Sequence, residues 1–178
     1  MRKNCESVMS YFGGKNSKLN YILPLLPPHK TYVEPFAGSL AVFFAKDPTP
    51  IEVVNDIDGD LVNFYRVLRD PFKAKELEKS LKLTLYSRQE FEENRDIWKS
   101  DRETWDTFTD VERAARWYIV HEMSFGAYHK AFRYSVSHAK RGIAGAVSSW
   151  ILHTSKFMNF HYRIRNAIIE NRDFRTVI

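Results

Sequence analysis

The hydrophobic positions along the first 70 residues follow two different spacings. Between residues 19 and 26 they recur every three or four positions, which predicts a helix that Pro27-Pro28 ends. Residues 31–34 and 51–55 form short β-prone runs instead, and each is predicted to be a strand. A segment with helical spacing follows each run, and the second of these segments covers residues 57–68, with Ile57, Leu61, Phe64, Tyr65 and Leu68 on one face.

This order of strand, loop, helix, strand, loop and helix is typical of a parallel sheet in an α/β fold. Right-handed crossovers place the carboxyl ends of neighbouring parallel strands at the same edge of the sheet. We therefore expect the loops that follow Glu34 and Asn55 to lie side by side.

Helical spacings dominate the middle of the chain. Ser87 with Glu90 and Thr109 with Glu112 match the spacing of capping boxes, which predicts a helix start at each place. Residues 125–145 are polar, basic and contain three glycines, so we expect a loop there.

A single long helix is predicted after this loop. It begins at about residue 148 and continues to residue 168, with Trp150, Phe157, Ile164 and Ile168 turned inward. Residues 171–178 then resemble the start of another strand.

The predicted elements divide the chain into three parts: residues 1–70, 71–168 and 169–178. We interpret them as the first part of an α/β core, a mainly helical insertion, and the start of a strand that returns to the core.

Positive charge is concentrated in the second half of the chain. Residues 113–169 hold nine cations and one acid, Glu122, whereas the whole chain has a net charge of +5. This asymmetry indicates a surface that faces a polyanion, although a solvated basic surface without a ligand is the alternative.

Composition narrows the classes of protein. Hydrophobic residues make up 44% and charged residues 28%, which are ordinary globular values. No apolar run approaches the roughly 20 residues that span a bilayer, and the N-terminus lacks the apolar region of a signal peptide, so a cytoplasmic protein without a membrane partner is expected. Cys5 is the only cysteine, which excludes an internal disulfide. The histidine spacings match no metal-ligand set, and no metal site is expected.

Three short motifs carry candidate chemistry. Glu34-Pro35-Phe36-Ala37-Gly38-Ser39 puts a carboxylate and a small-residue turn at a strand end, which suits a nucleotide-like ligand. Asp56 follows Gly38 by 18 residues, close to the separation of about 20 between glycine loop and ribose-binding acid in α/β cofactor sites. Tyr11-Phe12-Gly13-Gly14-Lys15 places a lysine on a turn, where it can meet a carboxylate or a phosphate. Taken singly, each motif also fits a structural role in a tight turn or a helix cap.

Taken together, the three motifs resemble those of the Dam-type (alpha group) site-specific DNA adenine-N6 methyltransferases, and the resemblance covers essentially the whole chain. In this family a recognition domain is inserted between the cofactor motifs and the catalytic motif. The resemblance implies an α/β fold: a partial Rossmann-like S-adenosylmethionine-dependent methyltransferase sheet with an inserted, mainly helical target-recognition domain. It implies S-adenosyl-L-methionine as the cofactor and double-stranded DNA as the partner.

The same resemblance implies which residues bind the cofactor. They come from both ends of the chain: Tyr11, Lys15, Glu34, Phe36, Gly38, Asp56, Ile57, Asp173 and Phe174. Asp56 matches the ribose-binding acid. Phe36 and Ile57 are placed to sandwich an adenine, although core packing is the commoner use of such residues. The family usually has a second glycine in the loop after Pro-Phe, where this chain has Ser39-Leu40.

A basic, aromatic segment is the candidate DNA contact. Its predicted DNA-binding residues are Lys130, Arg133, Tyr134, Lys140 and Arg141. Cationic side chains neutralise phosphates, and an aromatic ring can enter a base stack that a flipped adenine has left. A solvated basic loop with Tyr134 packed beneath it is the alternative.

The family's catalytic string, Asp-Pro-Pro-Tyr, does not occur in these residues. Asp47-Pro48-Thr49-Pro50 and Asp70-Pro71-Phe72 are the nearest strings, and both precede the recognition segment. We therefore expect a partial enzyme that does not methylate as a lone chain, with an apolar sheet edge that a complementing C-terminal half or a homodimer would cover. A DNA-binding module or pseudoenzyme with a vestigial cofactor pocket is the second hypothesis, and an unrelated nucleotide-binding α/β enzyme is the third.

Overall fold

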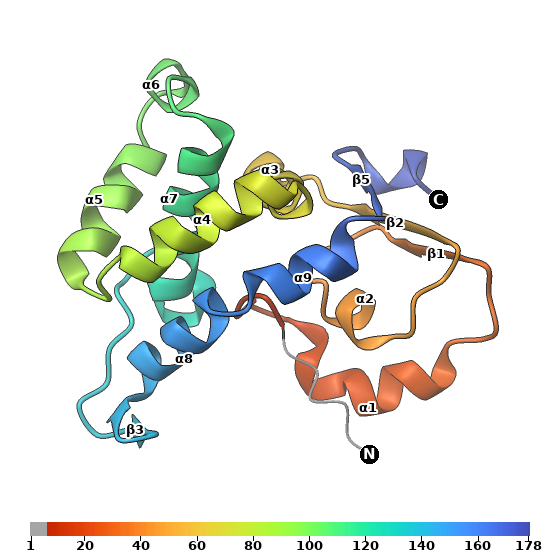
Figure 1. Cartoon of the computed structure of the whole chain (residues 1–178), viewed down its shortest axis with the longest axis horizontal. Helices are drawn as coiled ribbons and strands as arrows, with labels where there is room; N and C mark the ends of the chain where they lie inside the picture. Colours follow the sequence, from red (N-terminus) through yellow and green to blue (C-terminus); the bar gives the residue numbers. More distant parts are fainter. Residues whose placement is uncertain (1–6) are drawn as a thin grey trace.

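The computed structural model describes residues 7–178, so Cys5 lies outside the described residues. Three strands lie at one end of the molecule, and most helices lie at the other (Figure 1). The strands are β1 (Thr31–Glu34), β2 (Ile51–Asn55) and β5 (Ile168–Glu170). They form a parallel sheet in the order β1-β2-β5, which confirms the two predicted strands and the α/β class.

The register of the sheet brings the three carboxyl ends together. Glu34 pairs with Val54 on β2, and Asn55 pairs with Glu170 on β5. The loops that follow the strands therefore begin at the same edge, as the sequence predicts for parallel neighbours.

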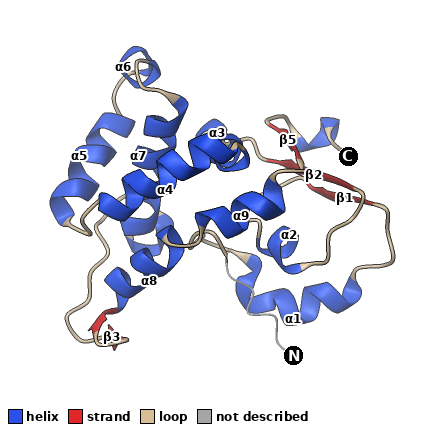
Figure 2. Cartoon of the chain, viewed as in Figure 1, coloured by secondary structure: helices blue, strands red, loops and turns tan. Residues whose placement is uncertain are grey.

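The described residues contain nine α-helices (Figure 2). They are α1 (Leu19–Ile22), α2 (Ala41–Ala45), α3 (Gly59–Arg69), α4 (Pro71–Leu83), α5 (Arg88–Trp98), α6 (Arg102–Asp106), α7 (Asp110–Met123), α8 (Gly145–Thr154) and α9 (Phe157–Ile164). None of the helices in this part of the chain is both long and apolar enough to cross a membrane.

Helix α3 joins the sheet to the helical end of the molecule. Asp58 caps it by accepting hydrogen bonds from the amides of Asp60 and Leu61. The face with Leu61, Phe64, Tyr65 and Leu68 is buried, as the spacing predicts. The sequence also placed Ile57 on that face, which is wrong. Ile57 precedes the cap and is 74% exposed.

Aromatic side chains of α3 and α7 fill the centre of the core. Phe64 stacks on Tyr118 with ring centroids 5.2 Å apart, and it also contacts Trp117 and Phe157. The full capping box predicted at Thr109 and Glu112 is present at the start of α7. One continuous cluster of buried side chains links the sheet to the helices, so packing alone would stabilise both ends together.

Two predictions about helix ends differ from the structure. The first is expected over residues 19–26, but α-helical geometry ends at Ile22, because Pro24 has no amide hydrogen to donate to the preceding turn. At Ser87 only half of the predicted capping box forms. Ser87 accepts from the Glu90 amide, while the Glu90 carboxylate accepts from Asn94.

The single helix predicted from residue 148 to 168 is also wrong, because the chain folds there as α8, α9 and β5. The break follows Thr154 and Ser155, whose hydroxyls donate to the backbone carbonyls of Trp150 and Leu152 and compete with the helical pattern. Ile168 lies in the strand and is 49% exposed. The predicted strand after Asn171 is instead a loop with a short 3-10 turn.

The predicted loop over residues 125–145 contains a small hairpin of β3 (Ala139–Lys140) and β4 (Ile143–Ala144). Its two-residue turn has positive φ at both Arg141 and Gly142, at 58° and 78°. This backbone is typical of a type I′ turn, whose twist matches the two strands.

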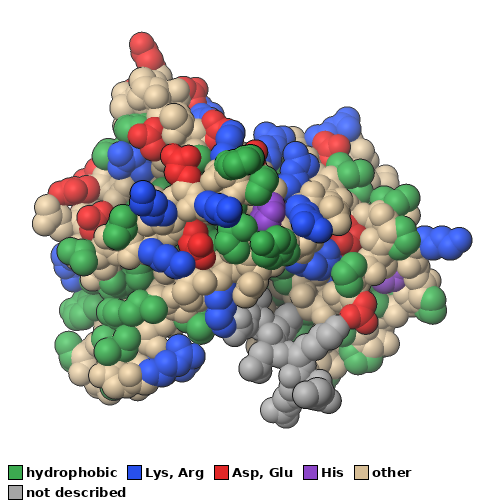
Figure 3. All heavy atoms as spheres, viewed as in Figure 1, with side chains coloured by type: hydrophobic (Ala, Val, Ile, Leu, Met, Phe, Trp, Pro, Cys, Tyr) green, Lys and Arg blue, Asp and Glu red, His purple; other side chains and the backbone are tan. Residues whose placement is uncertain are grey.

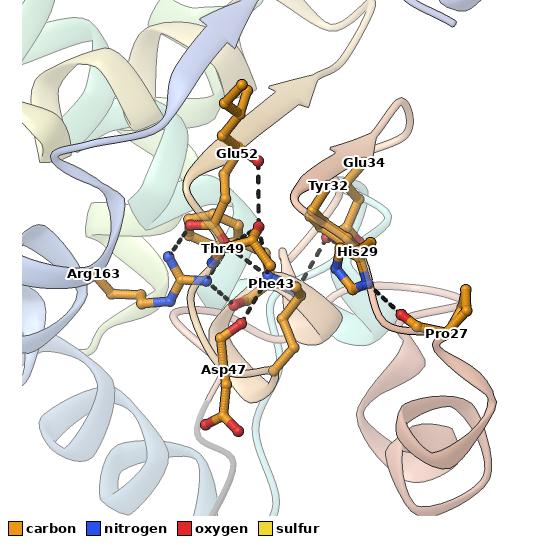
Figure 4. A network of polar contacts seen from close by, with 11 residues as sticks. Pro27, His29, Tyr32, Glu34, Phe43, Asp47, Thr49, Glu52 and Arg163 are labelled. Atoms are coloured by element: carbon orange, nitrogen blue, oxygen red, sulfur yellow. Dashed lines mark hydrogen bonds and ion pairs between the residues drawn. The ribbon is translucent and has the colours of Figure 1, made fainter.

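A buried ionic network links α9 to β2 (Figure 4). Arg163 donates to the Glu52 carboxylate at 2.8 Å and to the Phe43 carbonyl at 2.9 Å. Lys46 pairs with the same carboxylate. Two cations hold the pKa of Glu52 below its usual value, although burial opposes them. The network therefore links β2, α2 and α9 to one another.

Candidate functional site

A cavity of about 250 Å³ lies at the carboxyl edge of the sheet. Its lining comes from the N-terminal turn, from the loop after β1 and from the residue after β2: Tyr11, Phe12, Gly13, Gly14, Lys15, Phe36, Ala37, Gly38, Ser39, Ala41 and Asp56. The three motifs that the sequence analysis singled out therefore meet at one place, because parallel pairing of β1 and β2 aligns their loops.

Asp56 holds the loop that it faces. One carboxylate oxygen accepts from the Gly38 amide at 3.1 Å, and the other accepts from the Asp58 amide at 3.1 Å. The Gly38 carbonyl in turn accepts from the buried Tyr65 hydroxyl. A carboxylate thus lies in the wall of the cavity with its position fixed by backbone amides.

Gly38 and Tyr11 are in close contact. Gly38 has φ of 47°, and a side chain there would place its Cβ 3.3 Å from the Tyr11 ring. Both the left-handed backbone and the ring therefore favour glycine. Burial raises the pKa of Tyr11 to about 12, with smaller contributions from Asp56 and Asp58, so the phenol stays neutral at physiological pH.

Glu34 lies behind the cavity and is absent from its lining. It is 4% exposed, and its Oε2 accepts from both the Tyr32 hydroxyl at 3.0 Å and the Phe43 amide at 3.2 Å. Lys15, which does line the cavity, approaches the same carboxylate at 3.4 Å. Burial raises the pKa of Glu34, while the nearby Lys15 and these hydrogen bonds oppose the shift.

The predicted residues at the rim are arranged differently. The Phe36 ring faces Phe174, with centroids 5.1 Å apart, and both rings are well exposed. Ile57 does not line the cavity. Asp173 pairs with Arg175, which holds the pKa of Asp173 below its usual value.

Asn55 has a positioning role that sequence reasoning missed. Its side-chain amide donates to the carbonyls of Pro35 and Arg172 at 3.0 Å each, and its side-chain oxygen accepts from the Arg172 amide. One side chain therefore ties the ends of all three strands together. A polar residue that closes a strand beside Asp56 was the available signal.

The predicted DNA-binding residues do not all face solvent. Arg133 is 25% exposed in its side chain and lies 3.7 Å from the fully buried Glu122 carboxylate. Tyr134 is 64% exposed, with the Arg88 guanidinium 5.4 Å from its ring. The alternative in which Tyr134 packs beneath a loop does not match this exposure.

Lys130, Lys140 and Arg141 are exposed. Lys140 and Arg141 lie on the β3–β4 hairpin, and Figure 3 shows Lys and Arg side chains over the same corner of the molecule. Arg141 also approaches the Ser148 hydroxyl at 3.4 Å. The hairpin thus presents cations away from the core, where they can meet a phosphate.

The chain is similar to known DNA adenine methyltransferases. The sequence model of a family described as D12 class N6 adenine-specific DNA methyltransferase matches residues 11–178. The Type II methyltransferase M1.LlaDCHI of Lactococcus lactis subsp. cremoris is 33% identical over 131 residues, which are 71% of this chain and 44% of that protein.

Two further relatives match shorter stretches. The DNA N-6-adenine-methyltransferase of Escherichia phage P1 is 38% identical over 64 residues, 36% of this chain and 8% of that protein. The Retron Ec67 DNA adenine methylase of Escherichia coli is 38% identical over 61 residues, 34% of this chain and 21% of that protein. The chain spans less than half of the length of each relative over the matched region.

Proposed function

Because this chain belongs to the family of D12 class N6 adenine-specific DNA methyltransferases, we propose that it binds a methyl donor and duplex DNA for the methylation of adenine N6. The observation that carries this proposal is the cavity at the strand ends, where Tyr11, Gly38 and Asp56 converge. A DNA methyltransferase needs a nucleoside-binding pocket and a DNA-binding surface beside it. The chain has a candidate for each.

The methyl donor that we propose is S-adenosyl-L-methionine, which supplies an electrophilic methyl group when it is bound. The residues fit such a ligand. Asp56 presents a fixed carboxylate for the ribose hydroxyls, beside the Gly38 loop that also lines the cavity. The exposed Phe36 and Phe174 rings are proposed to hold the adenine, with Ile57 and Asp173 at the rim.

Lys15 and Glu34 are proposed to bind the amino-acid end of the cofactor. The Lys15 side chain is 45% exposed and lies between the cavity and the buried Glu34 carboxylate. A ligand carboxylate would attract Lys15, and a ligand ammonium would attract Glu34. Binding would then replace the Lys15–Glu34 pair with two pairs to the ligand.

We propose that the sheet is the first part of a Rossmann-like core. In this proposal residues 1–70 and 169–178 belong to the core, and residues 71–168 form an inserted target-recognition domain. The parallel strand order β1-β2-β5 supports this division, because β5 returns to the sheet after the helices. The continuous buried cluster means that the insertion packs on the core instead of hanging from a linker.

The proposed DNA surface consists of Lys130, Tyr134, Lys140 and Arg141, with Arg133 beside them. The exposed lysines and Arg141 are suited to phosphates, and the exposed Tyr134 ring is suited to an unstacked base. Arg133 faces Glu122 in this structure, so we propose that it acts by holding the neighbouring Tyr134 in place.

Methylation also needs a polar acceptor that orients the exocyclic amine of a flipped adenine. The Asp-Pro-Pro-Tyr string that serves this purpose in the resembling enzymes does not occur in residues 1–178. We therefore propose that these residues bind cofactor and DNA but do not transfer the methyl group by themselves.

Calorimetry with S-adenosylhomocysteine, the product of the donor, tests the proposal. The folded chain should bind one equivalent of S-adenosylhomocysteine. Its binding to duplex DNA should be measurable in parallel by fluorescence anisotropy. DNA binding without any binding of S-adenosylhomocysteine at millimolar concentration would favour a DNA-binding module with a vestigial pocket. Absence of both activities in a folded chain would contradict the proposed function.

A further inference from the structure

The last turns of α7 hold the backbone segment that leads into the cavity. The Ser10 amide donates to the Glu122 carboxylate, and the Ser10 carbonyl lies 2.5 Å from His121 Nε2. One turn earlier, the Tyr118 hydroxyl donates to the Val8 carbonyl at 2.9 Å. Both polar groups of the Ser10 backbone are therefore bound by α7, more than 100 residues away in the sequence.

The proton positions in this contact follow from the acceptor. A carbonyl can only accept, so His121 Nε2 carries a hydrogen and donates it to Ser10. The neutral His121 ring then accepts at Nδ1 from His129 Nε2, which lies 2.9 Å away. Burial lowers the pKa of His121, which keeps this ring neutral near pH 7.

Ser10 immediately precedes Tyr11, which forms a wall of the cavity. The Tyr11 ring contacts His121 with centroids 5.3 Å apart, and the Tyr11 carbonyl accepts from the Gly14 amide at 3.0 Å. A shift of Ser10 would therefore move both the ring beside Gly38 and the turn that carries Lys15.

The same Glu122 carboxylate faces the basic segment. His153 approaches it at 3.2 Å, and the Arg133 guanidinium lies at 3.7 Å. The Arg133 amide also donates to the Met123 carbonyl at 2.7 Å, directly after Glu122. Tyr134, exposed and next to Arg133, is thus held by the end of α7 that also holds Ser10.

We infer that Glu122 and His121 are positioning residues: through Ser10 both place Tyr11 at the cofactor pocket, and Glu122, through Arg133, also places Tyr134 at the DNA surface. This inference rests on the proposed function and extends it, because it predicts that the two ligands strengthen each other's binding. A ligand that tightens Tyr11 stabilises the arrangement of Glu122 that DNA binding also requires. By linkage the two effects are equal in size.

The test compares Glu122→Gln with the wild-type chain. The substitution keeps the size of the side chain, removes its charge and leaves Arg133 without a carboxylate. The affinity for S-adenosylhomocysteine is measured by calorimetry with and without a 20-base-pair duplex, and hydrogen exchange of the Ser10 amide is followed by NMR. In the wild type the duplex should tighten S-adenosylhomocysteine binding. In Glu122→Gln the affinity should fall about tenfold, equivalent to about 1.4 kcal/mol, and the effect of the duplex should disappear.

Two further variants keep the result interpretable. His121→Phe retains a buried ring and removes the donor to Ser10, so it should lose affinity in the same direction even if Glu122→Gln folds poorly. Glu52→Gln is the matched control, because Glu52 is also a buried carboxylate and pairs with Lys46 and Arg163, neither of which lines the cavity. It should change the affinity for S-adenosylhomocysteine by less than twofold.

The outcomes separate this inference from the function beneath it. Wild-type binding with unchanged affinity and unchanged duplex effect in Glu122→Gln and His121→Phe would overturn the inference alone. A wild-type chain that binds no S-adenosylhomocysteine would overturn the proposed function and the inference with it. In that case, a protected Ser10 amide that loses protection in Glu122→Gln would show that the contact is purely structural.

Discussion

The cofactor pocket and the basic segment use charged side chains in opposite ways. At the pocket, Asp56 and Lys15 line an open cavity, and their motifs follow directly from the ends of parallel strands. In the basic segment, Arg133 turns inward to the buried Glu122, while Lys140 and Arg141 extend from a hairpin. Sequence spacing thus predicts which residues lie together when they follow the ends of neighbouring parallel strands. It does not predict which way a cation in a loop will point.

The largest loss of cofactor affinity is expected at Asp56 in the pocket. Asp56→Ala removes both the proposed ribose acceptor and the acceptor of the Gly38 amide, so the affinity for S-adenosylhomocysteine should fall about 100-fold. Asp106→Asn is the control, because Asp106 pairs with Arg102 and Arg113 outside the cavity lining, and its effect should stay below about threefold. Calorimetry on the two variants measures both, and equal losses would contradict the assignment of Asp56.

The next effect separates inward from outward cations. Arg133→Ala should lower the free energy of unfolding by about 2 kcal/mol, because it leaves the buried Glu122 carboxylate without its guanidinium. Lys140→Ala should change it by less than about 0.5 kcal/mol, because Lys140 is exposed. Urea unfolding followed by circular dichroism measures both. A destabilisation of equal size in the two variants would break the comparison.

A pH dependence between pH 6.5 and 4 is expected at the α7 end. Burial lowers the pKa of His129 to about 4, with further contributions from His121 and Lys99. A histidine takes up its proton near pH 6.5 when unfolded, so stability is complete above that pH and is lost progressively between 6.5 and about 4. Glu122, whose pKa is held low by His153 and the Ser10 amide against burial, adds to the loss at the acid end.

Thermal unfolding between pH 7.5 and 4 measures this loss. The melting temperature should fall steadily below pH 6.5, and His129→Gln should flatten the profile between pH 6.5 and 5. The surrounding charged groups, Glu122, Arg133 and Lys99, are unchanged in that variant. An identical profile in the variant would remove His129 from the explanation.

The smallest effect is expected at the hairpin. Lys140→Ala and Arg141→Asn should each reduce the salt dependence of duplex binding by about one counterion and weaken binding only a few-fold at physiological salt. Asparagine is chosen at position 141 because it tolerates the positive φ of the turn. Fluorescence anisotropy at several salt concentrations measures the slope. Unchanged slopes in both variants would exclude the hairpin from the DNA surface.

Local pattern was sufficient to predict β1, β2, the buried face of α3 and the capping box of α7. Each depends on residues close in sequence, so periodicity and capping chemistry decide it. The break between α8 and α9 was missed because the hydroxyls of Thr154 and Ser155 compete with helical hydrogen bonds without interrupting the apolar pattern.

The long-range contacts were beyond sequence reasoning. Nothing in the spacing of Asn55 indicates that its side chain reaches both Pro35 and Arg172, and nothing near Ser10 indicates that α7 binds it. In the same way, Glu122 is recognisable in the sequence as the only acid among many cations, but only its burial shows that it pairs with one of them.

The account depends most on a ligand entering the cavity beside Gly38 and Asp56. Titration of S-adenosyl-L-methionine into the isotopically labelled chain, followed through backbone amide shifts, tests this directly. We predict saturable shifts at the amides of Gly14, Gly38 and Asp58, which lie at or bond to the cavity wall. A folded chain whose shifts stay unchanged at millimolar ligand, or move only in the helical end of the molecule, would contradict the account.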